Sequence, residues 1–159
     1  MAKFAEGTKV ATDKSRVELE GLLQRYGADS TAVFNSRGEA AVAFEMRGRR
    51  ILFRLKMPDQ DDARFTHRQG GFRGKEARSA DGARTAWEQA CRERWRALVL
   101  AVKAKLVSVE EGVETFEEAF MAHVVMPDGR TVSEHVKPRI AQAYSEQKMV
   151  PLLPGPNTR

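Results

Sequence analysis

The chain has 159 residues, which is enough to bury one hydrophobic core and too few to favour a second domain. Hydrophobic residues make up 42% and charged residues 31%, and no apolar run approaches the roughly 20 residues that a bilayer span needs, which excludes a membrane protein and a wholly disordered chain. The net charge of +5 is regional, because residues 47–105 carry sixteen Lys and Arg against seven Asp and Glu, a net of +9.

The first predicted element is a helix from Ser15 to Gly27. Ser15 and Glu18 have the spacing of a capping box, in which each side chain bonds the backbone N–H of the other residue. Apolar residues then recur on one face, and Gly27 can take the left-handed conformation that ends many helices. Upstream of this helix, residues 8–12 are a candidate short edge strand.

Three strands are predicted next, over Thr31–Asn35, Ala41–Met46 and Arg50–Met57, joined by short turns. In the second and third strands apolar residues alternate with small or charged ones, which is the pattern of a half-buried antiparallel sheet. Residues 47–56 contain five Lys and Arg and no acid. The outward face of the sheet is therefore expected to be basic.

A basic, glycine-rich segment follows the sheet. Residues 58–62 close the sheet with three acids, and residues 64–78 then read RFTHRQGGFRGKEAR, with three glycines, five Lys and Arg and no periodicity. This composition predicts a mobile basic loop over residues 63–78. Long loops carry function more often than short ones do, so this loop is a candidate for binding.

The stretch from Ser79 to Leu106 is predicted to be a long central helix. Its apolar residues recur at spacings of three and four, as on the buried face of a helix. They are Trp87, Cys91, Trp95, Leu98, Val102 and Leu106. Because Cys91 is the only cysteine, neither a disulfide nor a thiolate metal site is expected, which fits a reducing cytoplasm.

Shorter helices are predicted after the central one. Ser108–Glu111 and Thr115–Glu118 both have capping-box spacing, so the chain should turn at Gly112 and restart a helix that reaches Val124. The many glutamates make residues 110–118 the acidic end of the chain.

The last helical region is predicted to open at Thr131 and Glu134, and Pro138 is expected to kink or split it. Four apolar residues align along it, namely Val132, Val136, Ile140 and Tyr144. Residues 150–159 form an extended Pro-rich tail. The whole pattern predicts one α+β domain over residues 1–149.

No motif in the sequence supports an enzyme. Residues 70–75 are one residue short of a phosphate-binding loop, and Glu76 stands where a hydroxyl should meet magnesium. The order of elements is also that of metal-dependent nucleases, but Arg47 replaces the lysine of their Glu-x-Lys pattern. The three histidines, His67, His123 and His135, have no pair at ligand spacing. No catalytic residue, metal or cofactor is therefore expected.

The basic sheet face and loop are the candidate nucleic-acid site. Lys and Arg neutralise phosphates, glycines allow close backbone approach, and Phe65 or Phe72 can stack on an unpaired base. The predicted contacts to the DNA or RNA backbone are Arg47, Arg49, Arg54, Lys56, Arg64, Arg68, Arg73 and Lys75. No motif for sequence-specific recognition is present, and a purely solubilising surface is the alternative.

Several segments resemble a family of small proteins of tailed bacteriophages and prophages. They are residues 14–28, 86–92, 95–98, 126–132 and 152–156. The resemblance implies a bacterial host cytoplasm and a partner that is either nucleic acid or a host protein, and it implies no activity or site residue.

Two functions are therefore hypotheses. The first is a non-enzymatic accessory protein that binds nucleic acid without strong sequence specificity. The second is a protein-binding factor that inhibits or redirects a host or defence enzyme, through the Pro-Leu-Leu-Pro tail or the acidic residues 110–118.

Overall fold

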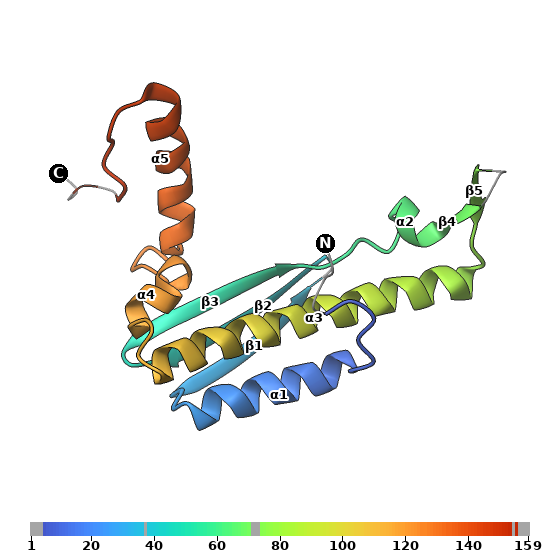
Figure 1. Cartoon of the computed structure of the whole chain (residues 1–159), viewed down its shortest axis with the longest axis horizontal. Helices are drawn as coiled ribbons and strands as arrows, with labels where there is room; N and C mark the ends of the chain where they lie inside the picture. The colour runs from blue at the N-terminus through green and yellow to red at the C-terminus, as the bar shows by residue number, and fades with distance from the viewer. Residues whose placement is uncertain (1–4, 37, 71–73, 154, 156–159) are drawn as a thin grey trace.

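The computed structural model describes residues 5–36, 38–70, 74–153 and 155. It has the predicted α+β fold, in which two helices cover one face of a three-stranded antiparallel sheet of order β1-β2-β3 (Figure 1). The elements of this body are α1 (Thr12–Arg25), β1 (Ser30–Ser36), β2 (Glu39–Met46), β3 (Arg49–Lys56) and α3 (Ala80–Glu110). The predicted hairpins are thus confirmed, with the turn between β2 and β3 at residues 47–48.

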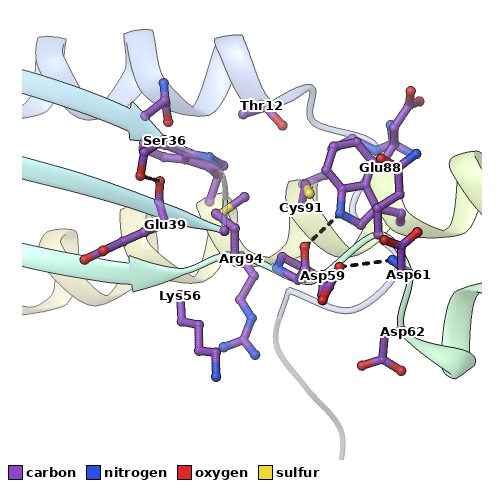
Figure 2. A pocket seen from close by; sticks show the side chains of 18 of the residues that line it. Thr12, Ser36, Glu39, Lys56, Asp59, Asp61, Asp62, Glu88, Cys91 and Arg94 are labelled. Carbon is purple, nitrogen blue, oxygen red and sulfur yellow. Dashed lines mark hydrogen bonds between the residues drawn. The ribbon is translucent and has the colours of Figure 1, made fainter.

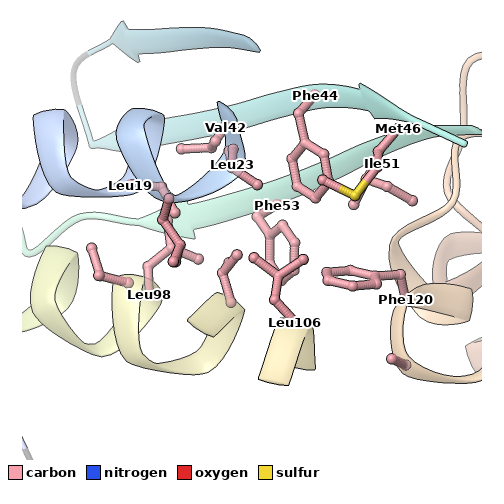
Figure 3. Packing of buried hydrophobic residues seen from close by; sticks show 14 of the residues in the cluster. Leu19, Leu23, Val42, Phe44, Met46, Ile51, Phe53, Leu98, Leu106 and Phe120 are labelled. Carbon is pink, nitrogen blue, oxygen red and sulfur yellow. The ribbon is translucent and has the colours of Figure 1, made fainter. Parts of the chain in front are cut away.

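The core lies between the sheet and the helices (Figure 3). Every second residue of β2 is buried, and β3 adds Ile51 and Phe53 from the same face. The ring of Phe120 in α4 (Phe116–Phe120) lies 5.8 Å from Phe44 and 6.4 Å from Phe53, and these two rings lie 6.5 Å from each other, all between centroids. Such aromatic pairs contribute about 0.5–1.5 kcal/mol each beyond the burial of their area.

Helix α1 begins earlier than the sequence predicted. It starts at Thr12 and has no side-chain cap, so the predicted capping box at Ser15 is wrong. Ser15 lies one turn before Leu19 on the buried face, and its fully buried hydroxyl has no hydrogen-bond partner among the residues that the structure describes. Packing of this face against α3 extends the helix over residues 12–14. Residues 8–11 form no strand, and Gly27 takes the predicted left-handed conformation.

Helix α3 begins after Ser79, whose hydroxyl accepts from the Gly82 N–H, and it continues to Glu110 rather than ending at Leu106. The predicted capping box at Ser108 is therefore wrong, because Ser108 lies inside this helix. The turn at Gly112 and the capping box of Thr115 and Glu118 are confirmed. After α4 the chain forms a short 3-10 helix, η1 (Met121–His123), and Val124 bridges to Ile51 of β3 instead of extending the helix.

The segment predicted as a loop without regular structure contains three short elements. They are α2 (Ala63–Thr66), β4 (His67–Gly70) and β5 (Gly74–Ala77), and the two strands form an antiparallel hairpin. Asp62 caps α2 by accepting from the Arg64 N–H, and an Arg68–Glu76 pair at 2.8 Å joins the strands. The sequence prediction missed these cross-strand contacts because the glycines masked the strand pattern.

The last helix is α5 (Val132–Glu146), which opens at the predicted capping box of Thr131 and Glu134. It runs through Pro138 without being split. Helix α5 extends away from the body and has no buried residue (Figure 1). Residues 150–153 are not helical, as predicted. No helix in the described part of the chain is long and apolar enough to cross a membrane.

Candidate functional site

The predicted nucleic-acid contacts are distributed along the length of the molecule. Arg47 and Arg49 lie at the turn between β2 and β3, whereas Lys56 is at the opposite end of β3. The first and last residues of this eight-residue strand are about 23 Å apart. Arg64 and Arg68 lie beyond the sheet, in α2 and β4. Arg73 and the side chain of Lys75 are outside the described residues.

Three of these cations are paired with carboxylates. Arg54 lies 3.8 Å from Glu39 and 3.9 Å from Glu134 of α5. Arg64 lies 3.3 Å from Asp62, and Arg68 pairs with Glu76. Exposed pairs of this kind stabilise a fold very little, but each carboxylate offsets the positive potential that would attract a phosphate.

The outward face of the sheet is mixed in charge rather than basic. The strand register places Arg50, Arg54 and Lys56 on this face opposite residues of β2 that include Glu45 and Glu39. Arg50 bonds Glu45 at 2.9 Å. The β3 sequence alone contains no acid, so the carboxylates come from β2: Glu45, which the predicted alternation already placed on this face, and Glu39, which lies before the predicted strand. Between the charges, this face is apolar, with Ala32, Phe34, Ala41, Ala43 and Leu52.

A groove of about 1280 Å³ lies where residues 57–62 cross the first half of α3 (Figure 2). Trp87 and Cys91 line it, and the Trp87 Nε1–H donates to the Pro58 carbonyl at 2.9 Å. Burial raises the pKa of the Cys91 thiol, which favours its protonated form. The charged lining has both signs: Glu39, Asp59, Asp61, Asp62 and Glu88 against Lys56, Arg64, Arg92 and Arg94.

Lys56 and Arg94 differ from the other cations of this groove in their side-chain contacts. Neither forms an ion pair or a side-chain hydrogen bond with any residue that the structure describes, whereas Arg92, which also has no ion pair, donates to Gln89. In Figure 2 both side chains extend in the same direction, Lys56 from the end of β3 and Arg94 from α3. Two unpaired cations at one opening can bind an anion.

The groove and its surroundings contain no recognisable catalytic arrangement among the described residues. No group of three or more His, Cys, Asp or Glu in the described ranges is placed to hold a metal ion. His123 stacks on Phe53 at a centroid distance of 3.9 Å. His135 contacts Asp128 at 2.9 Å, at the base of α5. Both histidines thus have structural contacts, His123 with the core and His135 with the turn before α5.

Exposed large hydrophobic side chains are concentrated in α5 and residues 147–153, which we call the C-terminal arm. Five of the ten large hydrophobic side chains that are exposed in the described residues lie here: Ile140, Tyr144, Met149, Leu152 and Leu153. Tyr144 is 83% exposed and Met149 is 88% exposed. The sequence showed the apolar alignment of α5, but it could not show that no other element covers it.

The base of the arm is held mainly by polar contacts. Thr131 and Glu134 form the reciprocal capping box, with the Thr131 N–H donating to the Glu134 carboxylate at 2.7 Å. This backbone donor lowers the pKa of Glu134, and the Arg130 N–H likewise lowers the pKa of Asp128. The Val132 N–H donates to the Val124 carbonyl and Glu134 lies 3.9 Å from Arg54, so the first turn of α5 is joined to the body, whereas no residue of α5 is buried.

Comparison of the chain with protein-family models, with curated proteins and with solved structures found no match.

Proposed function

We propose that this protein is a non-enzymatic protein-binding factor and that the C-terminal arm contacts its partner. The observation that carries this proposal is the row of exposed apolar side chains on the arm. Val136, Ile140 and Tyr144 recur at intervals of four residues, which is the arrangement by which an amphipathic helix enters an apolar groove. Clusters of exposed apolar side chains on a protein surface mark interaction sites.

The chemistry of the arm defines the partner. The apolar row is flanked by Lys137, Arg139 and Lys148, with Glu146 the acid near its end. The complementary surface is an apolar groove with an acidic rim, because charge complementarity at the rim orients an encounter. The resemblance to phage proteins favours a host enzyme as the partner that carries this groove. Binding of the arm would inhibit or redirect that enzyme.

The test is capture of proteins from a nuclease-treated bacterial lysate on the tagged chain, followed by quantitative mass spectrometry. We expect a stoichiometric partner that Tyr144→Asp and Ile140→Asp release, because each places a charge in the apolar contact. Val113→Asp is the matched control, since Val113 is 76% exposed in the turn before α4 and far from the arm in sequence. Circular dichroism checks that all variants fold. Binding that is insensitive to both arm variants would contradict the proposal.

A second candidate function is binding of nucleic acid, and the unpaired cations Lys56 and Arg94 favour it together with the net charge of residues 47–105. Fluorescence anisotropy of labelled DNA and RNA, titrated with salt, tests it. Affinity should fall log-linearly with salt, and Lys56→Glu with Arg94→Glu should reduce the slope by about two. Lys137→Glu with Lys148→Glu on the arm is the control, because it makes the same total change in charge. Flat traces at low salt would eliminate this candidate.

A further inference from the structure

We propose that two copies of this chain associate through β1, so that two three-stranded sheets join into one six-stranded antiparallel sheet. The interaction surface is the free edge of β1, and its occupant is the β1 strand of a second copy. This interface is separate from the C-terminal arm and does not depend on the function proposed for it.

The two edges of the sheet differ in how they are protected. The β3 edge carries Arg49, Arg50, Arg54 and Lys56, and its first half is covered by residues 124–125, with the Val125 N–H donating to the Arg50 carbonyl at 2.8 Å. In contrast, β1 reads STAVFNS, without a charge or a proline. All of its residues are exposed except Val33, which is half buried. Natural monomers protect such edges, so an unprotected one indicates pairing.

Two hydrogen bonds at the ends of β2 show which backbone N–H and C=O groups of β1 point away from the sheet. The Asp29 N–H donates to the Glu45 carbonyl at 2.8 Å, and the Met57 N–H donates to the Gly38 carbonyl at 2.9 Å. Odd-numbered residues of β2 therefore direct their backbone groups to β1, and even-numbered residues direct theirs to β3. Those odd residues stand opposite even residues of β1. The N–H and C=O groups of Thr31, Val33 and Asn35 consequently point to the open side.

The outward backbone groups of these three residues can pair with those of the same three residues in a second copy. A two-fold axis at Val33 sets Val33 opposite its own copy and Thr31 opposite Asn35, which satisfies every outward group with about six hydrogen bonds. On the outer face, Phe34, which is 59% exposed, then stands opposite Ala32 of the second copy, whose small side chain leaves room for the ring. No like charges meet, because β1 has none.

The same geometry limits the assembly to two copies. An isologous contact uses the one free edge of each sheet, and the β3 edges that remain outside are charged and partly covered. Pairing through one seven-residue strand buries little area, so we expect a reversible dimer rather than an obligate one.

Sedimentation velocity of the full chain between about 1 and about 200 μM measures the association. We expect a monomer–dimer equilibrium that Thr31→Pro and Phe34→Lys weaken at least tenfold, the first by removing an outward N–H and the second by placing charge at the edge. Tyr144→Lys on the arm is the control and should dimerise as the wild type does. A wild-type chain that stays monomeric throughout, or a dimer that only the arm variant weakens, would overturn the proposal.

Disulfide trapping tests the register directly. In a Cys91→Ala background, Val33→Cys should cross-link on mild oxidation, because a hydrogen-bonded pair places the two α-carbons about 5.5 Å apart. Asn35→Cys lies on the same face of the strand but away from the axis, and it should not cross-link. Equal cross-linking of both variants would exclude this register.

Discussion

At the scale of single residues, His123 couples the fold to pH. Its half-buried ring stacks on Phe53. Burial, followed by the nearby charge of Lys105, lowers the pKa of this imidazole from its ordinary value of 6.5. The folded protein therefore binds this proton less tightly than the unfolded chain does, and protonation favours unfolding.

We expect the free energy of unfolding to decrease as the pH falls through 6.5 and to level off below the folded-state pKa of His123. Urea unfolding at about pH 7.5, 6.5 and 5.5 measures this. The variant His123→Phe keeps an aromatic ring that can stack on Phe53, and its free energy of unfolding should not show this decrease between about pH 7.5 and about pH 5.5. Glu118, Asp128 and Glu134 do not contribute in this window, because backbone donors lower their pKa values and their stabilisation is lost only at more acidic pH. A variant with the wild-type pH profile would refute the assignment.

At the scale of elements, α5 shows how a proline is tolerated inside a helix. Pro138 has no N–H to donate to the Glu134 carbonyl four residues earlier. Arg130, just before the helix, donates from Nη2 to that oxygen at 3.0 Å. The guanidinium thus replaces the missing backbone bond, and the helix continues to Glu146.

This substitution of donors can be measured with a double-mutant cycle. Pro138→Ala should stabilise the arm by about 1–3 kcal/mol, because it restores the backbone donor. Arg130→Met should cost about 1 kcal/mol in the wild type and less in the Pro138→Ala background, where the carbonyl has its usual partner. Denaturant unfolding followed by far-ultraviolet circular dichroism gives the four values. Identical costs in both backgrounds would show that the Arg130 contact is incidental.

Capping boxes and hydrophobic alternation, which are local sequence signals, predicted several helix starts and the buried face of the strands. The capping boxes at Thr115 and Thr131 both form, and the alternation along β2 and β3 gives the correct buried face. The same capping signal failed at Ser15 and Ser108, where tertiary packing extends α1 and α3 past those residues. The site was less predictable, because ion pairs such as Arg54 with Glu134 join residues distant in sequence.

At the scale of the whole molecule, the body and the arm differ in how firmly their helices are held. Helix α3 buries six residues against the sheet and α1, whereas α5 buries none. In hydrogen exchange followed by mass spectrometry, residues 139–146 should exchange at least about 100-fold faster than residues 95–106, because local opening of the arm breaks few apolar contacts. Adding the partner should slow exchange in the arm. Equal protection of both segments in the isolated chain would contradict this difference.

Helix α3 is longer than the sheet that it covers. Its 31 residues span about 46 Å at 1.5 Å per residue, whereas the eight-residue strands span about 26 Å. The overhang carries α2 and the β4–β5 hairpin at one end of the molecule, and the arm leaves from the other end (Figure 1). A small ligand therefore cannot contact the β4–β5 hairpin and the base of the arm at the same time, because these lie at opposite ends of α3.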